Sequence, residues 1–501
     1  MMNRIIQACA DHKFLVLIFV AVAVMLGWYS LNNTKLDAIP DLSDTQVIVY
    51  SKWDRSPDIM EDQVTYPIVS ALLGMPKVRD IRGFSDFGYS YVYVIFEDGT
   101  DLYWARSRTL EYLNSILSRL PQGVQTELAK DETAVGWVYE YALVDKTGKY
   151  NLADMKSYQD WYLRYALQAV PGVAEVAPIG GFVRQYQVNV DPNKLLAYKI
   201  PIDKVVDAVS KNNNDVGARL VEFSGREYMV RGRGYIKSVS DIQQAVVATN
   251  PATGTPILVR DLGTTTLGPD LRRGVAELDG QGEVVGGVVI MRFGENAEKV
   301  IERVKAKLDE LKPTLPPGLE VVPTYDRSEL IDRSIENLKG TLIEELTIVS
   351  LVIVVFLWHI PSAMVPIITI PLALLLSFIP MHAMGLTANI MSLGGLAIAI
   401  GAMVDASIVI VEQTHKKLEH WEAEGRPGPY KEVIISAVKE VGGPSFFALL
   451  VIGSRSCRCS PWKPRKDGFL SLWRSRRTSP WQLPRFWLSP WSRSSYCYSY
   501  A

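Results

Sequence analysis

The hydrophobic residues of the chain gather into a few long runs, separated by one long polar stretch. Phe14–Leu31 is an uninterrupted apolar run, and no further run of membrane length occurs before residue 339. Three runs then follow closely, at Leu342–Trp358, Ala363–Ile379 and Ile390–Val411, and another opens at Phe446. A helix of about 20 apolar residues crosses a bilayer. The pattern predicts four membrane-spanning helices, the start of a fifth, and a large soluble portion between the first and the second.

Positive charges at the ends of these runs predict their orientation. Arg4 and Lys13 precede the first run, and the triplet His415-Lys-Lys follows the run that contains residues 390–411. Because Lys and Arg are enriched in cytoplasmic loops, we expect both ends on the cytoplasmic side. Residues 34–338 would then lie outside the inner leaflet, which in a bacterium is the periplasm. The first run lacks the small-residue cleavage site of a signal peptide and is interpreted as an uncleaved anchor.

The soluble portion shows signs of an internal repeat. Gly74-Met-Pro-Lys-Val-Arg-Asp-Ile and Val170-Pro-Gly-Val-Ala-Glu-Val each follow a helical pattern and precede an alternating, strand-like one, Tyr89–Phe96 and Gln185–Val190 respectively. This predicts two α+β units of the split βαβ kind, each with helices on one face of a sheet. A strand-rich insertion is expected at Gly181–Leu271. The predicted fold is thus a membrane α-helical bundle that carries α+β units.

The overall composition does not reveal the separation into apolar runs and a soluble portion, because it averages over both. The 501 residues are 48% hydrophobic and carry a formal net charge of −1, values of an ordinary soluble protein. Cys9 is the only cysteine before residue 457, so the soluble portion needs no disulfide and no redox chemistry is implied. The chain contains no GxxxxGK[ST] pattern, which argues against a nucleotide as its energy source.

Asp405 is the strongest candidate for function. It lies inside the apolar run at residues 390–411. An ionised carboxylate near the centre of a bilayer costs at least a few kcal/mol, so such residues usually mark proton or ion pathways. The alternative is a structural carboxylate that pairs with a basic group on another helix. Glu412 lies on nearly the same helix face, where the apolar run gives way, and is equally well interpreted as an interfacial charge.

Several segments resemble the heavy-metal efflux branch of the resistance-nodulation-division transporters, and within it the copper/silver exporters. They are Asp41-Leu-Ser-Asp-Thr-Gln-Val, Tyr91-Val-Tyr-Val-Ile-Phe-Glu-Asp-Gly-Thr, Tyr103-Trp-Ala-Arg-Ser-Arg, Gly136-Trp-Val-Tyr-Glu-Tyr-Ala-Leu-Val-Asp and Thr324-Tyr-Asp-Arg-Ser-Glu-Leu-Ile. The likeness runs from about residue 4 to residue 452. It implies a proton-driven antiporter of the bacterial inner membrane, without a cofactor, which is a secondary transporter and not an enzyme.

The resemblance also implies partners and a division of the chain. The partners are two further copies in a homotrimer, a periplasmic membrane-fusion adaptor, a TolC-like outer-membrane channel and the lipid bilayer, with no nucleic acid. The implied division is 1–33 for a cytoplasmic segment and the first span; 34–180 for the first porter subdomain and the start of the second; 181–271 for a docking insertion; 272–338 for the rest of the second porter subdomain; 339–414 for spans two to four; 415–441 for a cytoplasmic loop; 442–452 for the start of a fifth span; and 453–501 for an aberrant tail.

By the same resemblance Asp405 is the proton-relay aspartate, and Met391 and Met403 belong to a stepwise thioether path for the metal. Met is also a common filler of apolar cores. Leu271 and Ile410 stand where the copper/silver exporters have methionines, so the path would be incomplete. Gly394, Gly395 and Gly401 are interpreted as sites of close helix packing.

The substrate prediction rests on two departures and on ligand chemistry. Ala399-Ile-Gly stands where divalent-cation exporters carry Asp-Phe-Gly, and Ala406 follows Asp405 where drug exporters carry a second aspartate. Residues 34–338 contain no histidine, while Zn, Co and Ni sites rely on imidazole and Cu(I) and Ag(I) prefer sulfur ligands. We therefore predict Cu(I) or Ag(I) as the transported ion. The alternatives are export of divalent cations, and a membrane-anchored periplasmic module that does not transport.

The tail after residue 452 departs from everything before it. It is rich in Arg, Trp, Ser and Pro, it holds three of the four cysteines, and Asp467 is its only acidic residue. Such a segment does not continue a bilayer span. A lipid- or nucleic-acid-binding segment and a metal clip at Cys457-Arg-Cys are two interpretations. We favour a third, a shifted reading frame, in which case the chain is a truncated and inactive N-terminal half of a longer pump.

Overall fold

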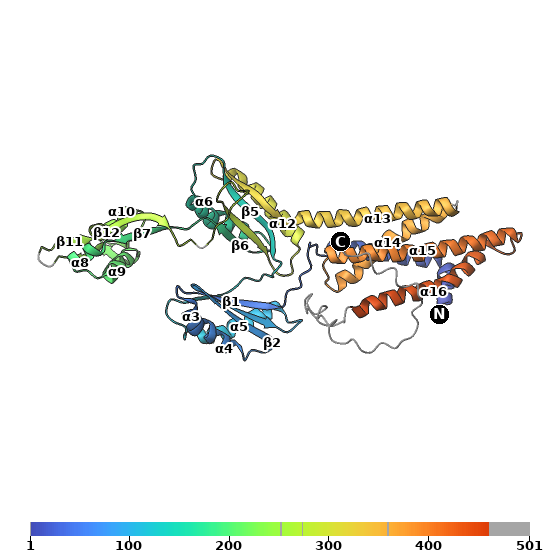
Figure 1. Cartoon of the computed structure of the whole chain (residues 1–501), viewed down its shortest axis with the longest axis horizontal. Helices are drawn as coiled ribbons and strands as arrows, with labels where there is room; N and C mark the ends of the chain where they lie inside the picture. Colours follow the sequence, from blue (N-terminus) through green and yellow to red (C-terminus); the bar gives the residue numbers. More distant parts are fainter. Residues whose placement is uncertain (1, 251–252, 273, 358–359, 460–501) are drawn as a thin grey trace, which may run out of the picture.

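The computed structural model of the chain describes residues 2–250, 253–272, 274–357 and 360–459. Its parts lie in a row along the long axis of the molecule (Figure 1). Long helices gather at one end, two units of sheet and helix lie in the middle, and a smaller unit that contains α8 to α11 lies at the far end. The predicted fold class, a helical membrane bundle with α+β units, is confirmed.

The first middle unit is a four-stranded sheet on which two helical segments pack, α3 to α4 and α5. Its elements are β1 (Gln46–Lys52), α3 (Pro57–Met60), η1 (Glu61–Thr65), α4 (Tyr66–Leu72), β2 (Val78–Asp86), β3 (Tyr89–Phe96), α5 (Leu102–Leu117) and β4 (Gln125–Leu128). The strand order is β2-β3-β1-β4, and every neighbouring pair is antiparallel. Alternate strand residues such as Val92 and Val94 are buried with Ile68 and Leu113 of the helices. This is the predicted split βαβ arrangement.

The second middle unit repeats this topology with other residues. Its elements are β5 (Trp137–Asp145), α6 (Leu152–Tyr158), η2 (Gln159–Leu163), α7 (Arg164–Gln168), β6 (Val173–Gly180), β13 (Val285–Met291), α12 (Ala297–Leu311), η3 (Lys312–Thr314) and β14 (Leu319–Asp326). The order β14-β5-β13-β6 matches that of the first unit strand for strand. In both units the first helix carries a π-helical turn, η1 or η2, at its middle. The shared irregularity strengthens the inference of an internal repeat.

The strand Gln185–Val190 does not take the place that the repeat predicted for it. It lies in β7 (Arg184–Val190), which pairs with β12 (Gly263–Pro269) outside the second sheet. In the second unit, the third strand of the repeat is β13, which begins about 100 residues after β7 begins. Gly180 and Gly181 have φ of +70° and +64°, a left-handed conformation that turns the chain away from the sheet. Alternation identified a strand correctly but not its partner.

The insertion contains short paired strands, as predicted, and helices that were not. Its elements are β7, α8 (Pro192–Tyr198), α9 (Ile202–Asn212), β8 (Val216–Phe223), β9 (Arg226–Gly232), α10 (Val239–Gln243), β10 (Val246–Thr249), β11 (Pro256–Leu258), α11 (Val259–Leu262) and β12. The pairs are β7 with β12, β8 with β9, and β10 with β11. Ile200, Val205, Ile257 and Leu262 form a small core of its own. The unit is therefore built separately from the two sheets.

The long helices are α1 (Met2–Asp11), α2 (Lys13–Asn33), α13 (Arg327–Leu357), α14 (Ile360–Ala383), α15 (Ile390–Ala423) and α16 (Tyr430–Cys459). Within the described residues, four segments are long and apolar enough to cross a membrane: Lys13–Asn33, Met364–Ala383, Ile390–Ala423 and Tyr430–Val451. The predicted second span coincides with the last part of α13, and its final residue, Trp358, lies outside the described residues.

Residues 415–441, predicted as a loop, are mostly helical. α15 continues to Ala423, and only residues 424–429 separate it from α16. The apolar run ends at Val411, but ion pairs between residues four apart, such as Lys416 with Glu412 at 2.6 Å, support further helical turns. The tail predicted from residue 453 lies outside the described residues except for the last turns of α16, and the side chains there are not described.

Candidate functional site

The helix that carries Asp405 begins at a well-defined cap. The Asn389 side chain accepts hydrogen bonds from the backbone N–H groups of Met391 and Ser392, both at 3.0 Å. In return, the Ser392 hydroxyl accepts a hydrogen bond from the Asn389 N–H at 2.8 Å. These contacts satisfy donors that the first helical turn leaves without partners. They fix the start of α15 at Ile390.

Replacing Asn389 by alanine is expected to destabilise the chain by about 1 kcal/mol, because two N–H groups at a buried helix start lose their acceptor. Urea unfolding of the full chain in detergent measures this loss. Asn389→Ser is the matched control, since serine caps about as well as asparagine. Equal midpoints for the alanine and serine variants would show that the cap contributes nothing.

One face of α15 packs on the neighbouring helices. Ile400 and Val404 are buried in a cluster with Val349 and Ile353 of α13 and Ile370 of α14. Leu393 and Val411 extend this buried face towards the two ends of the helix. The α15 helix has 34 residues, so its length of about 50 Å exceeds the hydrocarbon core of a bilayer, about 30 Å thick. Asp405 lies near its middle.

Asp405 itself lies on a different, uncovered face. Exposed residues recur there with the spacing of one helix face, at Met391, Gly395, Ile398, Asp405 and Glu412. No described residue gives the Asp405 carboxylate a hydrogen bond or an ion pair. The alternative of a structural carboxylate paired with a basic group therefore finds no partner in the described part of the chain. We call this row of five residues the open stripe; sequence analysis missed it, although its spacing was readable.

Glu412 shares this stripe but has a different environment. Its carboxylate pairs with Lys416 at 2.6 Å, and the Glu412 side chain is 50% exposed. The pair lies where the apolar run ends, beside the positive residues that predicted a cytoplasmic end. This is the environment of an interfacial charge, whereas Asp405 lies seven residues deeper in the apolar run.

The two methionines proposed for a metal path lie on different faces of α15. Met391 is 65% exposed, on the open stripe. Met403 packs against the buried cluster that holds Ile400 and Val404. They are twelve residues apart in the sequence, which separates them by about 18 Å along the helix axis. A single site with both thioethers is not formed, and a stepwise role for each remains a prediction.

Among the described residues, the glycines of α15 do not make the close packing that was expected. A Cβ added at Gly394, Gly395 or Gly401 would meet no described atom within 4 Å. Gly27 of α2 makes such a contact instead, since its added Cβ would lie 3.0 Å from the Leu375 carbonyl oxygen. The small residues of α15 therefore leave room on the helix surface and do not bring α2, α13 or α14 closer.

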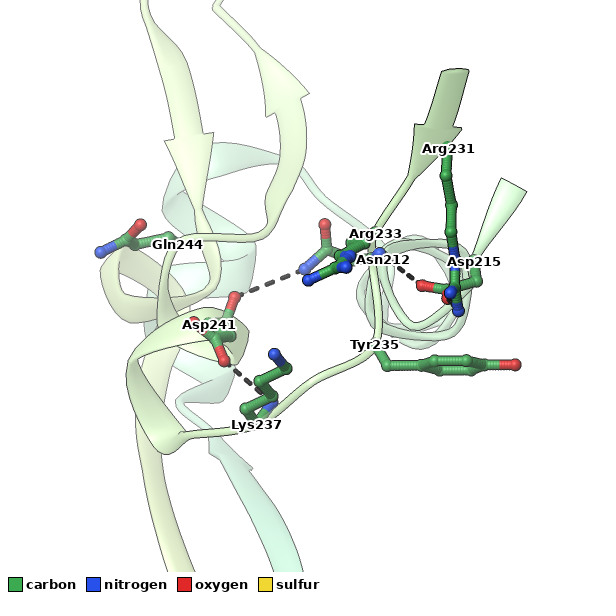
Figure 2. A pocket seen from close by; sticks show the side chains of 9 residues that line it. Asn212, Asp215, Arg231, Arg233, Tyr235, Lys237, Asp241 and Gln244 are labelled. Atoms are coloured by element: carbon green, nitrogen blue, oxygen red, sulfur yellow. Dashed lines mark hydrogen bonds and ion pairs between the residues drawn. The ribbon is translucent and has the colours of Figure 1, made fainter. Parts of the chain in front are cut away.

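A polar cavity of about 680 Å³ lies in the insertion (Figure 2). The insertion lies far from α15, the helix that contains Asp405 (Figure 1). Figure 2 shows Asp215 facing Arg231, and these side chains pair at 2.7 Å. The Asp241 carboxylate accepts a hydrogen bond from the Lys237 N–H at 2.9 Å. The described lining contains no Met, Cys or His, and no group of three His, Cys, Asp or Glu in the described part could hold a metal. This cavity does not suit a soft cation.

Comparison with known proteins settles the family. Residues 5–454 match the model of the AcrB/AcrD/AcrF family. The chain belongs to this family. It is 50% identical over 458 residues to the cation efflux system protein CusA of Escherichia coli, with 90% of this chain and 44% of the relative covered. It is 37% identical over 464 residues to the cobalt-zinc-cadmium resistance protein CzcA of Cupriavidus metallidurans, with 90% of this chain and 43% of the relative covered.

A solved structure agrees with the sequence comparisons. The crystal structure of a heavy metal efflux pump matches with a TM-score of 0.76 at 32% identity, covering 89% of this chain and 43% of that one. The resemblance to heavy-metal efflux pumps, predicted from short segments, is confirmed. The chain spans about 44% of the length of the CusA protein that it matches.

Proposed function

We propose that this chain is the proton-carrying part of an inner-membrane secondary transporter that exports Cu(I) or Ag(I) in exchange for protons. The observation that carries the proposal is Asp405, a carboxylate midway along a membrane-length helix, on a face that the described residues leave open. Membership of a family that includes cation efflux proteins supports it.

The chemistry of Asp405 follows from its position. In hydrocarbon a carboxyl group is much less costly when it is neutral. The Asp405 carboxylate is expected to take a proton at an Oδ atom when it is accessible from the periplasm and to release it on the cytoplasmic side. Each charge that moves down a potential of 100 mV yields about 2.3 kcal/mol. A charged Asp405 needs a partner over the open stripe, and the described residues do not provide one.

The substrate proposal rests on ligand chemistry and on identity. Residues 34–338 contain no histidine, so an imidazole-built divalent site has no ligands there. The chain is also closer to CusA, at 50% identity, than to the cobalt-zinc-cadmium resistance protein, at 37%. Both observations favour a soft monovalent cation. For partners we propose a homotrimer, a periplasmic adaptor and an outer-membrane channel. The insertion lies at the end farthest from the membrane helices (Figure 1), and this position supports a contact between the insertion and the channel.

A growth test decides the substrate. We expect a metal-sensitive bacterium to gain resistance to copper and silver, but not to zinc or cobalt, when it carries a complete pump made of residues 1–452 continued by the C-terminal part of Escherichia coli CusA. The reason is that residues 34–338 contain no histidine for an imidazole-built divalent site. The same pump with Asp405→Asn controls for effects of expression. Resistance to zinc or cobalt alone would exclude our choice of substrate.

A further inference from the structure

The start of the Asp405 helix is tied by its backbone to the segment that leaves the first membrane helix. Leu36 and Ala388 form a parallel bridge. The Asp37 N–H donates to the Ala388 carbonyl at 3.0 Å, and the Ile390 N–H donates to the Ala38 carbonyl at 3.1 Å. Residues 35–38 therefore follow any displacement of the N-terminus of α15.

Arg327 joins this segment to the second α+β unit. It is the first residue of α13 and follows directly on the last residue of β14. Its guanidinium pairs with the Asp37 carboxylate at 3.4 Å, and the two side chains are only 5% and 11% exposed. It also donates to the carbonyl of Val135 at 2.6 Å and to that of Trp137, where β5 begins.

The Arg327–Asp37 pair lies where further contacts hold the backbone of both segments in place. β5 is an inner strand of its sheet, between β14 and β13. Lys35, two residues before Asp37, donates its Nζ to the carbonyl of Gly294 in the same unit. Burial raises the pKa of the Asp37 carboxyl, and Arg327 is the first of the groups that oppose this shift. The charge on Asp37 is thus sustained by Arg327.

We propose that Arg327 and Asp37 are positioning residues that couple the placement of the Asp405 helix to the β5 sheet of the second unit. This inference rests on the proposed function, in which protonation of Asp405 shifts α15. The physical path runs from α15 through the backbone hydrogen bonds between residues 36–38 and 388–390 to Asp37. It then continues through the Arg327 guanidinium to the Val135 and Trp137 carbonyls. A displacement of α15 along its axis then moves the N-terminal end of β5.

Hydrogen exchange in the full chain, reconstituted in lipid nanodiscs without metal, tests the coupling. Asp405→Asn, which imitates the neutral carboxyl, is expected to change the exchange rates of β5 and β13 amides by about fivefold or more. In an Arg327→Gln background this difference should vanish. Arg333→Gln is the matched control on the same helix, because the Arg333–Glu329 pair is exposed, at 74% and 66%. The control should keep the difference.

Asp37→Asn keeps the shape of the side chain and provides a second variant if Arg327→Gln does not fold. The measured quantity is the difference between the two Asp405 states, which a purely structural loss of protection would leave in place. Persistence of that difference in both variants would overturn the proposal, and so would its absence in the unmodified chain. Because no metal is present, failure of the growth test with copper and silver would leave this result unaffected.

Discussion

Replacing Asp405 by asparagine is expected to reduce the metal resistance given by the complete pump to the level of cells without it. Asparagine has nearly the same shape but cannot take up or release a proton, so the proton gradient no longer drives the cycle. The amount of pump in the membrane should not fall, since no described residue bonds to the Asp405 carboxylate. Growth on silver, together with immunoblots of membrane fractions, measures both quantities.

Glu412→Gln is the matched control for this change. It removes a carboxylate from the same open stripe, seven residues away, where Lys416 already compensates the charge. We expect it to keep nearly full resistance, because exposed ion pairs contribute at most about 1 kcal/mol. Full resistance of the Asp405→Asn pump would remove Asp405 from the proton path. Equal loss in both variants would mean that the whole stripe, and not one carboxylate, is required.

Hydrophobic patterns predicted the membrane helices and the strands of this chain because each kind of element has a characteristic length or period in the sequence. Membrane runs follow bilayer thickness, and the alternation in Tyr89–Phe96 is that of a half-buried strand. Asp405 was identifiable because a charge inside an apolar run is costly wherever the helix packs. The motif-based resemblance then identified the family, which the match over residues 5–454 confirmed.

What the sequence could not predict depends on contacts between distant segments. Gln185–Val190 reads as a strand, but its partner lies about 80 residues away in β12. Arg327 and Asp37 are 290 residues apart, and nothing near either residue signals the pair. The different environments of Met391 and Met403 depend on which face of α15 meets α13. Local periodicity contains no information on any of these pairings.

One glycine in the fully buried strand β13, Gly287, shows how such a contact constrains the sequence. Gly287 lies against the ring of Tyr141, a residue of the hydrophobic core of the second unit that is only 1% exposed. Burial raises the pKa of Tyr141, so its hydroxyl stays protonated and donates to the Gln159 Oε1 at 2.9 Å. Gln159 is itself fully buried, in the π-helical turn η2. A glycine inside a strand often marks such a close approach.

We expect Gly287→Ala to destabilise the second unit by about 3 kcal/mol. The added Cβ would lie 2.6 Å from the Tyr141 hydroxyl and 2.8 Å from the Gln159 Nε2, which forces the ring aside and leaves buried polar groups unpaired. Pulse proteolysis of the full chain in urea, with cleavage sites assigned by mass spectrometry, measures the loss in this unit. Gly340→Ala is the control, because its Cβ would meet nothing within 4 Å and alanine favours helix. A Gly287→Ala chain as resistant as the control would show that the Tyr141–Gln159 contact does not hold this core together.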